Sequence, residues 1–506
     1  MTGDQQNEID NQSKPQGVRR FLRFSLIYAL GDALAKGARI VLIPYYLSVL
    51  EQSQIGELAI VQAIIFLSWT LLAFGLGFAV RRYYYDYEKA GQSDAFVSSL
   101  WVSRWLGGLP VYGCLMLVGW WFYHWSEGTI SLQLILLAIT AGFLKGGLNV
   151  VEFWLNIREE PVKYRAFTFS QFLLTTLLII YFVTFQSLGV LGIVLGEIVS
   201  YSLFVLVSAF MLFSKSKPML TVVRWKEVTA YCAPVLPHAL FMWGLMGVDR
   251  LVLTEYVGKA EIGVYEIGYL LGSFLSIVVR SMRAAWIPAY FRGAERTDSK
   301  AEFAKTASIY FVCTFATALL GLLYAPEIIW LFSLWSPSSY SESATIMQIV
   351  LFGFVAMAVF LAINQPLLYE QRTGLLASIS GFGLAVNLVA NWTLVPRFGI
   401  YGAAYATVIA YVAISLLTLT IMRRFYDFKW NGVQNVVLST IFVLFGSTVF
   451  LLPNVPLLWI QPIKIVIFIM FLLATFFRIG RKPDNRIKIE ARFTVRDVGR
   501  RPRVSQ

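Results

Sequence analysis

Stretches of about twenty predominantly apolar residues recur along almost the whole chain, separated by short polar connections. A helix of that length crosses a bilayer, because each residue adds about 1.5 Å and the hydrocarbon core is about 30 Å thick. The pattern predicts an all-α, polytopic membrane protein with about fourteen transmembrane helices. The expected spans are 24–48, 57–80, 95–122, 130–156, 166–186, 189–213, 227–252, 261–290, 303–323, 344–369, 374–394, 399–421, 435–452 and 456–478.

The composition agrees with this pattern. Hydrophobic residues make up 58% of the 506 residues and charged residues only 14%, a balance typical of membrane proteins rather than soluble domains. The cysteines Cys114, Cys232 and Cys313 lie in apolar segments, and neither histidine belongs to a metal-binding motif. We therefore expect no metal site, no cofactor and no catalytic residue.

Basic residues are concentrated in alternate connections. If the N-terminus is cytoplasmic, the connections on its side hold roughly 32 Lys and Arg residues, against about 3 on the opposite side (Arg250, Lys259 and Arg397). This asymmetry follows the positive-inside rule, and a missed or extra helix would destroy it. It predicts that both termini are cytoplasmic. It also accounts for the net charge of +13 without a nucleic-acid partner.

The first predicted helix carries charges at membrane depth. Asp32, Lys36 and Arg39 fall within about 60° of one another on a helix. A charge at the bilayer centre costs on the order of 3 kcal/mol, so this stripe must face other helices or a water-filled path. Alternatively, Asp32 and Lys36 form an internal ion pair of purely structural value.

Charged residues recur in other predicted helices. Cations outnumber acids slightly, which suits an anionic guest, because Arg and Lys bind phosphate oxygens well. The predicted cations of this polar path are Lys36, Arg39, Arg104, Lys145, Arg280 and Arg283, and the acids are Asp32, Glu152, Glu197 and Glu266. Arg280 and Arg283 have an alternative, because near the cytoplasmic end they can extend to lipid headgroups instead.

A weak internal repeat relates the two halves of the chain. Residues 30–34 resemble residues 236–240, and Ile55-Gly56-Glu57 resembles the segment that begins Ile262-Gly263-Val264. The offset of about 206 residues corresponds to six predicted helices. Because six is even, both copies keep the same orientation, and such halves place a substrate between them.

Three segments carry a family resemblance: LGDALAKGARIVLIPYYLSVLEQSQIGELAIVQ, AEIGVYEIGYLLGSFLSIVVRSMRAAWIPAYF and NLVANWTLVPRFGIYGAAYATVIAY. With the order of features along nearly the full length, they make the chain similar to the polysaccharide transporter branch, the Wzx-like O-antigen flippases. This branch belongs to the multidrug/oligosaccharidyl-lipid/polysaccharide exporter superfamily.

The resemblance implies two six-helix bundles with two additional helices. The expected division is a cytoplasmic segment 1–23, an N-terminal bundle 24–213, a C-terminal bundle 214–421, extra helices 422–478 and a basic cytoplasmic tail 479–506. It also implies alternating access and a cationic central cavity in a bacterial inner membrane.

The implied substrate is an undecaprenyl-pyrophosphate-linked oligosaccharide, moved across that membrane for O-antigen, capsule or exopolysaccharide synthesis. Membrane lipids and other polysaccharide-assembly proteins are the expected partners. Related members are thought to be coupled to ions, so a coupling proton on Asp32, Glu197 or Glu266 is a further hypothesis.

Other functions stay open at this point. A multidrug exporter of the same superfamily would prefer an acidic cavity, whereas a lipid II flippase would need similar chemistry to the one expected here. A membrane-bound polysaccharide polymerase or glycosyltransferase would need acids or a sizeable loop on the outer side. The outer connections are short and contain no paired-carboxylate motif.

Overall fold

The computed structural model describes residues 42–126, 128–158, 160–280, 282, 300–364, 367, 372–425, 432–448 and 457–480. Within these residues every regular element is a helix, which confirms the all-α prediction. The helices of the N-terminal half are α3 (Gln52–Leu72), α4 (Leu76–Lys89), α5 (Ser93–Trp125), α6 (Leu132–Ile157), α7 (Pro161–Ile180), a π-helical turn (Tyr181–Phe185) and α8 (Gly189–Phe213).

A linker that includes a short 3-10 turn (Leu220–Val222) leads into the C-terminal half. Its helices are α9 (Trp225–Tyr256), α10 (Lys259–Ser273), α12 (Lys300–Leu323), α13 (Ala325–Ser333), α14 (Ser343–Ile363), α16 (Thr373–Phe425), α17 (Gly432–Ser447) and α18 (Leu457–Gly480).

Nine helices in the described part of the chain are long and apolar enough to cross a bilayer, or ten if the bent pair Tyr310–Leu323 and Ala325–Ser333 is one span. Helix α16 changes direction at Gly399, whose φ of 54° and ψ of −131° are not helical. It therefore contains both predicted spans 374–394 and 399–421. Every predicted span from 57–80 onward overlaps a described helix, so the chain is a polytopic membrane protein.

The predicted span 57–80 is broken in the structure. Helix α3 ends at Leu72, and α4 begins at Leu76 after a turn in which Phe74 (φ 51°) and Gly75 (φ 67°) adopt left-handed conformations. Such a conformation is costly for most residues and cheap for glycine. The break leaves carbonyl groups at the end of α3 that need other donors.

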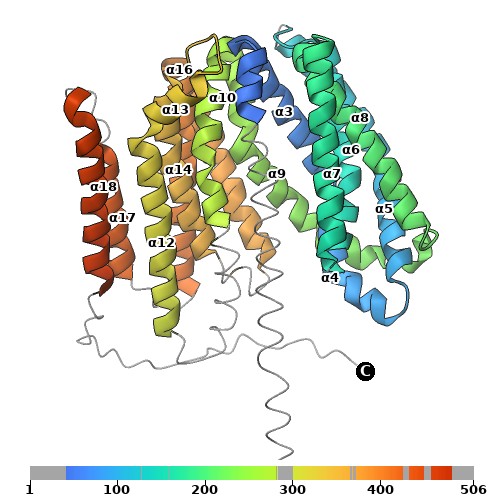
Figure 1. The fold of residues 1–506 in the computed structure, drawn as a ribbon. Helices are drawn as coiled ribbons and strands as arrows, with labels where there is room; N and C mark the ends of the chain where they lie inside the picture. The colour runs from blue at the N-terminus through green and yellow to red at the C-terminus, as the bar shows by residue number, and fades with distance from the viewer. Residues whose placement is uncertain are drawn as a thin grey trace, which may run out of the picture.

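The helices form two groups that meet at one end and diverge toward the other (Figure 1). One group contains α4 to α8, and the other contains α10, α12 to α14 and α16 to α18. Helices α3 and α9 lie between them, and α3 packs against both α6 and α10. The helix ends that carry the basic connections, such as the end of α4, lie where the groups are far apart.

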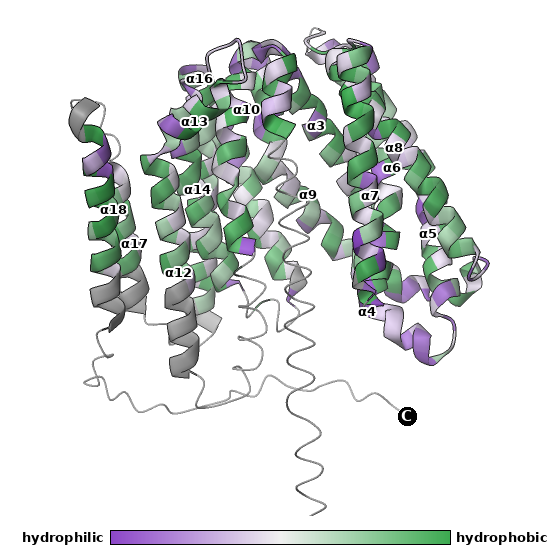
Figure 2. Cartoon of the chain, in the orientation of Figure 1, coloured by the Kyte–Doolittle hydropathy of each residue, from purple (hydrophilic) through white to green (hydrophobic). Residues whose placement is uncertain are grey.

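The outward faces of the helices are apolar (Figure 2). Large hydrophobic side chains such as Leu117, Phe185 and Phe210 are 70%, 73% and 76% exposed. A soluble protein would not tolerate so much exposed apolar surface, whereas lipid acyl chains cover it favourably.

Candidate functional site

Several predicted site residues cannot be placed. Asp32, Lys36, Arg39 and Arg283 lie outside the described residues. The structure places the other six in different surroundings: Arg104, Lys145, Glu152, Glu197, Glu266 and Arg280.

Lys145 lies inside the N-terminal half, where α3, α6 and α8 converge. Its Nζ is 4.9 Å from the ring centroid of Trp69 on α3 and 5.8 Å from that of Tyr201 on α8. Such contacts are attractive, because the ring face carries partial negative charge. Gly142 makes this packing possible, since a Cβ there would stand 2.6 Å from the Cβ of Ser68.

Acidic and amide groups accompany Lys145. Glu197, one turn before Tyr201 on α8, accepts a 3.1 Å hydrogen bond from the side chain of Gln62 on α3. Glu152 lies two turns from Lys145 on α6 and interacts with its charge. The structure thus brings Lys145, Glu152 and Glu197 into one region, which we name the α3–α6–α8 cluster: Gln62, Trp69, Lys145, Glu152, Glu197 and Tyr201.

Arg104 on α5 is fully buried and binds neutral groups. Its Nε donates to the carbonyl oxygen of Leu72 at 3.1 Å, and its Nη2 donates to that of Phe143. The guanidinium carbon lies 4.3 Å from the ring centroid of Trp105. A Cβ on Gly146 would lie 2.5 Å from Nη2, so this glycine makes room for the arginine. Arg104 therefore satisfies a carbonyl exposed by the break between α3 and α4.

Glu266 on α10 belongs to a second buried group in the C-terminal half. Both Nε and Nη2 of Arg250 donate to its Oε2, at 3.0 and 2.9 Å. Nη1 of Arg250 donates to Asp249 at 2.8 Å, and the hydroxyl of Tyr265 also donates to Asp249. The guanidinium lies 3.9 Å from the ring centroid of Tyr269. One guanidinium is thus enclosed by two carboxylates and two aromatic rings.

The sequence reasoning missed this arrangement. The charge count assigns Arg250 to the side opposite the basic connections, but Arg250 is only 5% exposed and Asp249 only 2%. Asp249 and Arg250 are neighbours within the predicted apolar span 227–252. Two opposite charges side by side in such a span indicate a buried ion pair, and this pattern could have predicted the arrangement.

Arg280 is exposed and lies at the far end of the helical residues that follow α10. Its Nη2 donates to the hydroxyl of Ser276, four residues earlier, at 3.2 Å. The structure does not bring it next to Lys145 or Arg104. Within the part of the chain that the structure describes, the predicted site residues therefore lie at several separate locations.

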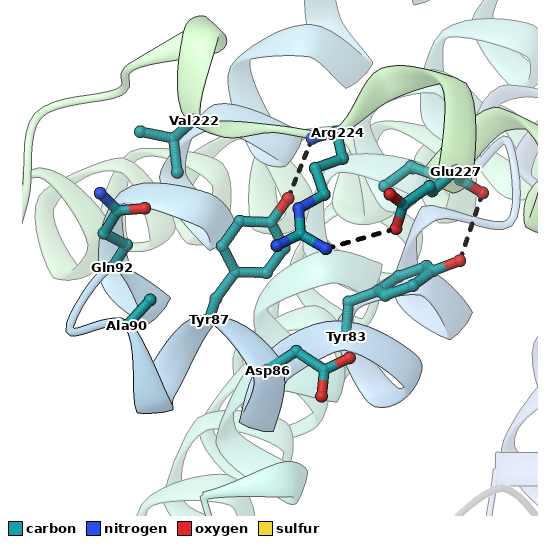
Figure 3. Close-up of a pocket in the computed structure, with 9 residues that line it drawn as sticks. Tyr83, Asp86, Tyr87, Ala90, Gln92, Val222, Arg224 and Glu227 are labelled. Carbon is teal, nitrogen blue, oxygen red and sulfur yellow. Dashed lines mark hydrogen bonds and ion pairs between the residues drawn. The ribbon is translucent and has the colours of Figure 1, made fainter. Parts of the chain in front are cut away.

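A small pocket lies where α4 meets the linker between the halves (Figure 3). The backbone N–H of Arg224 donates to the hydroxyl of Tyr87 at 2.9 Å, and the hydroxyl of Tyr83 donates to the carbonyl oxygen of Glu227 at 3.3 Å. The side chains of Arg224 and Glu227 pair at 3.7 Å. These contacts tie the linker and α9 to α4, so the pocket marks a joint between the halves. In the part of the chain that the structure describes, no group of three or more His, Cys, Asp or Glu side chains could hold a metal ion.

Two family models match the chain. The family described as "Polysaccharide biosynthesis protein" matches residues 21–293, and the MatE family matches residues 234–393. An "Uncharacterized membrane protein" of Haemophilus influenzae is 21% identical over 313 residues, which cover 60% of this chain and 74% of that protein.

Solved structures share the fold. The lipid II flippase MurJ in an inward closed conformation superposes with a TM-score of 0.64 at 15% identity, over 90% of this chain and 99% of that one. A multidrug resistance MATE family transporter in an inward-facing conformation gives 0.59 at 14% identity, over 77% and 94% of the two chains.

Proposed function

The chain belongs to the polysaccharide biosynthesis protein family, a branch of the multidrug/oligosaccharidyl-lipid/polysaccharide exporter superfamily, and on that premise we propose that it flips a lipid-linked oligosaccharide. Membership makes it a membrane transporter rather than an enzyme. The proposed substrate is an undecaprenyl-pyrophosphate-linked oligosaccharide, moved from the cytoplasmic to the outer leaflet of a bacterial inner membrane for surface polysaccharide synthesis. Both termini are proposed to be cytoplasmic.

The family match carries this proposal, and the α3–α6–α8 cluster supports it physically. Sugars and pyrophosphate cannot cross hydrocarbon unaided, because each lost hydrogen bond costs several kcal/mol. Trp69 and Tyr201 offer ring faces of the kind that pack against sugar rings, and Lys145 offers an ammonium for phosphate oxygens. The sequence-based proposal that Lys36, Arg39, Arg280 and Arg283 also contact the substrate stays a prediction, and Arg280 would do so at a place separate from the cluster.

Arg104 takes a different part in the proposal. Its donors point at the carbonyl groups of Leu72 and Phe143, so it acts as a positioning residue that holds the broken helix beside the cluster. For ion coupling, Glu197, Glu266 and Asp32 are the candidate carriers, with Glu266 already hydrogen-bonded to Arg250.

Leaflet exchange tests the function. Proteoliposomes carrying a fluorescent lipid-linked oligosaccharide should show exchange with the wild-type protein and at least about tenfold less with Lys145→Ala, since a hydrogen bond to a charged group contributes about 1.5–3 kcal/mol. Lys226→Ala is the matched control, because Lys226 is an exposed lysine in the first turn of α9, away from the cluster. Exchange no faster than in protein-free liposomes, with correctly folded wild-type protein, would refute the proposal.

A second candidate is a multidrug exporter of the same superfamily. Asp249 and Glu266 outnumber the single guanidinium that they enclose, and an acidic interior favours a cationic guest. The same proteoliposomes, loaded with a cationic dye or with lipid II in place of the oligosaccharide, distinguish these substrates. Faster movement of the dye than of the oligosaccharide would favour the exporter.

A further inference from the structure

Three cationic residues are buried in the described part of the chain: Arg104, Arg250 and Lys464. Two of them have acidic partners. Arg250 is paired with Asp249 and Glu266, and Nζ of Lys464 donates to Oε1 of Glu327 on α13. Arg104 differs from both, because within the described residues it forms no ion pair and no acidic side chain acts on its charge.

An unpaired guanidinium is unfavourable in such a place. An ion taken out of water without an opposite charge strongly destabilises a fold, and arginine cannot escape this cost by losing its proton. The carbonyl oxygens of Leu72 and Phe143 and the ring of Trp105 carry only partial negative charge, so they offset part of the cost. A full negative charge beside Arg104 would offset the rest.

One hydrogen-bond donor of Arg104 is unpaired. Its Nε and Nη2 donate to carbonyl oxygens, whereas Nη1 is buried and has no partner among the described residues. The same is true of the indole Nε1 of Trp105, whose ring centroid lies 4.3 Å from the guanidinium carbon. Both atoms can only donate. Two adjacent donors favour an anion over a water molecule, because water also needs acceptors for its own hydrogens.

The surroundings limit the size of this anion. Arg104 is 0% exposed, and the ring centroid of Phe143 lies 4.6 Å from its guanidinium carbon. A Cβ on Gly146 would stand 2.5 Å from Nη2. Such close packing excludes a pyrophosphate with its sugars, whereas a halide is a single atom that N–H groups can surround.

We propose that Arg104 and Trp105 form a halide site that takes chloride as a structural counter-ion. The ion accepts hydrogen bonds from Nη1 of Arg104 and Nε1 of Trp105 and neutralises the guanidinium. Because Nε of the same guanidinium donates to Leu72, bound chloride stabilises the end of α3 at its break. Neither residue belongs to the α3–α6–α8 cluster, and the inference does not rest on the proposed transport function.

Thermal unfolding of the purified full-length protein in detergent tests the site. The wild-type protein should unfold at a temperature about 2–4 °C higher in sodium chloride than in sodium gluconate of equal ionic strength. The gain should grow with the logarithm of the chloride concentration once the site is filled, as expected for one bound ligand. Sodium bromide should act like chloride. Equal unfolding temperatures in chloride and gluconate would overturn the inference.

Two arginine variants locate the effect. Arg104→Met removes the cation and should abolish the difference between the two salts. Arg82→Met is the matched control, because the side chain of Arg82 on α4 is 55% exposed, and it should keep the difference. A salt difference that persists in Arg104→Met would contradict the site.

A gentler variant covers the case in which Arg104→Met does not fold. Trp105→Phe keeps a ring against the guanidinium but removes the indole donor, so it should weaken the apparent chloride affinity about tenfold. Trp120→Phe, at a 54% exposed tryptophan of the same helix, should leave the affinity unchanged. Equal affinities in these two variants would count against the proposal.

Diffraction locates the ion without any variant. Crystals of the wild-type protein grown in sodium bromide should show an anomalous peak beside Nη1 of Arg104. Density there without anomalous signal would indicate water instead of a halide and would overturn the inference.

Discussion

The two halves of the molecule bury an arginine in opposite ways. Arg104 in the N-terminal half donates to backbone carbonyls and lies on aromatic rings, all of which are neutral. Arg250 in the C-terminal half is enclosed by the carboxylates of Asp249 and Glu266. Removing Arg250 therefore leaves buried charge uncompensated, whereas removing Arg104 leaves carbonyl groups without donors. Arginine thus stabilises the N-terminal half through hydrogen bonds to backbone carbonyls and the C-terminal half through ion pairs.

The largest expected effect is on Arg250. Arg250→Ala should lower the free energy of unfolding by about 3–5 kcal/mol, because the buried carboxylate of Asp249 and the partly buried carboxylate of Glu266 lose their partner. Thermal unfolding in detergent measures this. The triple variant Asp249→Asn, Arg250→Met, Glu266→Gln removes all three charges and should recover part of the loss. An Arg250→Ala protein as stable as the wild type would show that Asp249 and Glu266 do not depend on Arg250 for charge compensation.

A smaller effect is expected for Arg104. Arg104→Met keeps most of the apolar volume but removes the donors to Leu72 and Phe143, so it should cost about 2–3 kcal/mol. Because the lost partners are neutral, the loss should be independent of pH between 5 and 8. Unfolding temperatures across that range provide the measurement, and a strong pH dependence would show that a charged partner had been overlooked.

The smallest effect concerns the basic connection between α6 and α7. Burial favours the neutral acid at Glu160, but the hydrogen bond from Lys163 and the charge of Arg158 outweigh it and lower the pKa of that carboxyl group. A lowered pKa stabilises the folded state above the unfolded pKa, and the gain disappears as the pH falls through the folded pKa. The difference in unfolding temperature between wild type and Glu160→Gln should therefore shrink on acidification from pH 7 to pH 3. A constant difference would contradict this.

Much of the fold could be predicted because its signals are local. The apolar spans fix where helices form, since a lipid-exposed backbone must satisfy its own hydrogen bonds. The basic connections predict sidedness, and the similarity of the Gly56 and Gly263 segments already related the two halves. The structure then shows these glycines against each other, which no periodicity in either segment reveals.

The candidate site was less predictable, because what a buried cation does depends on its neighbours in space. Arg104 and Lys145 look alike as single charges in apolar spans. Arg104 donates to the carbonyl oxygens of Leu72 and Phe143, which are 32 and 39 positions away in the sequence. Lys145 instead lies against aromatic rings of α3 and α8. The charge count assigned Arg250 to an outer connection, whereas the structure shows its side chain bound to Glu266 of α10.

By itself, then, the sequence determined that this chain is a polytopic helical membrane protein, because length, hydropathy and charge act residue by residue. The tertiary structure decided which charges pair, where α3 breaks and where the halves touch. Those outcomes depend on distances between segments far apart in the chain, and helix packing alone sets these distances.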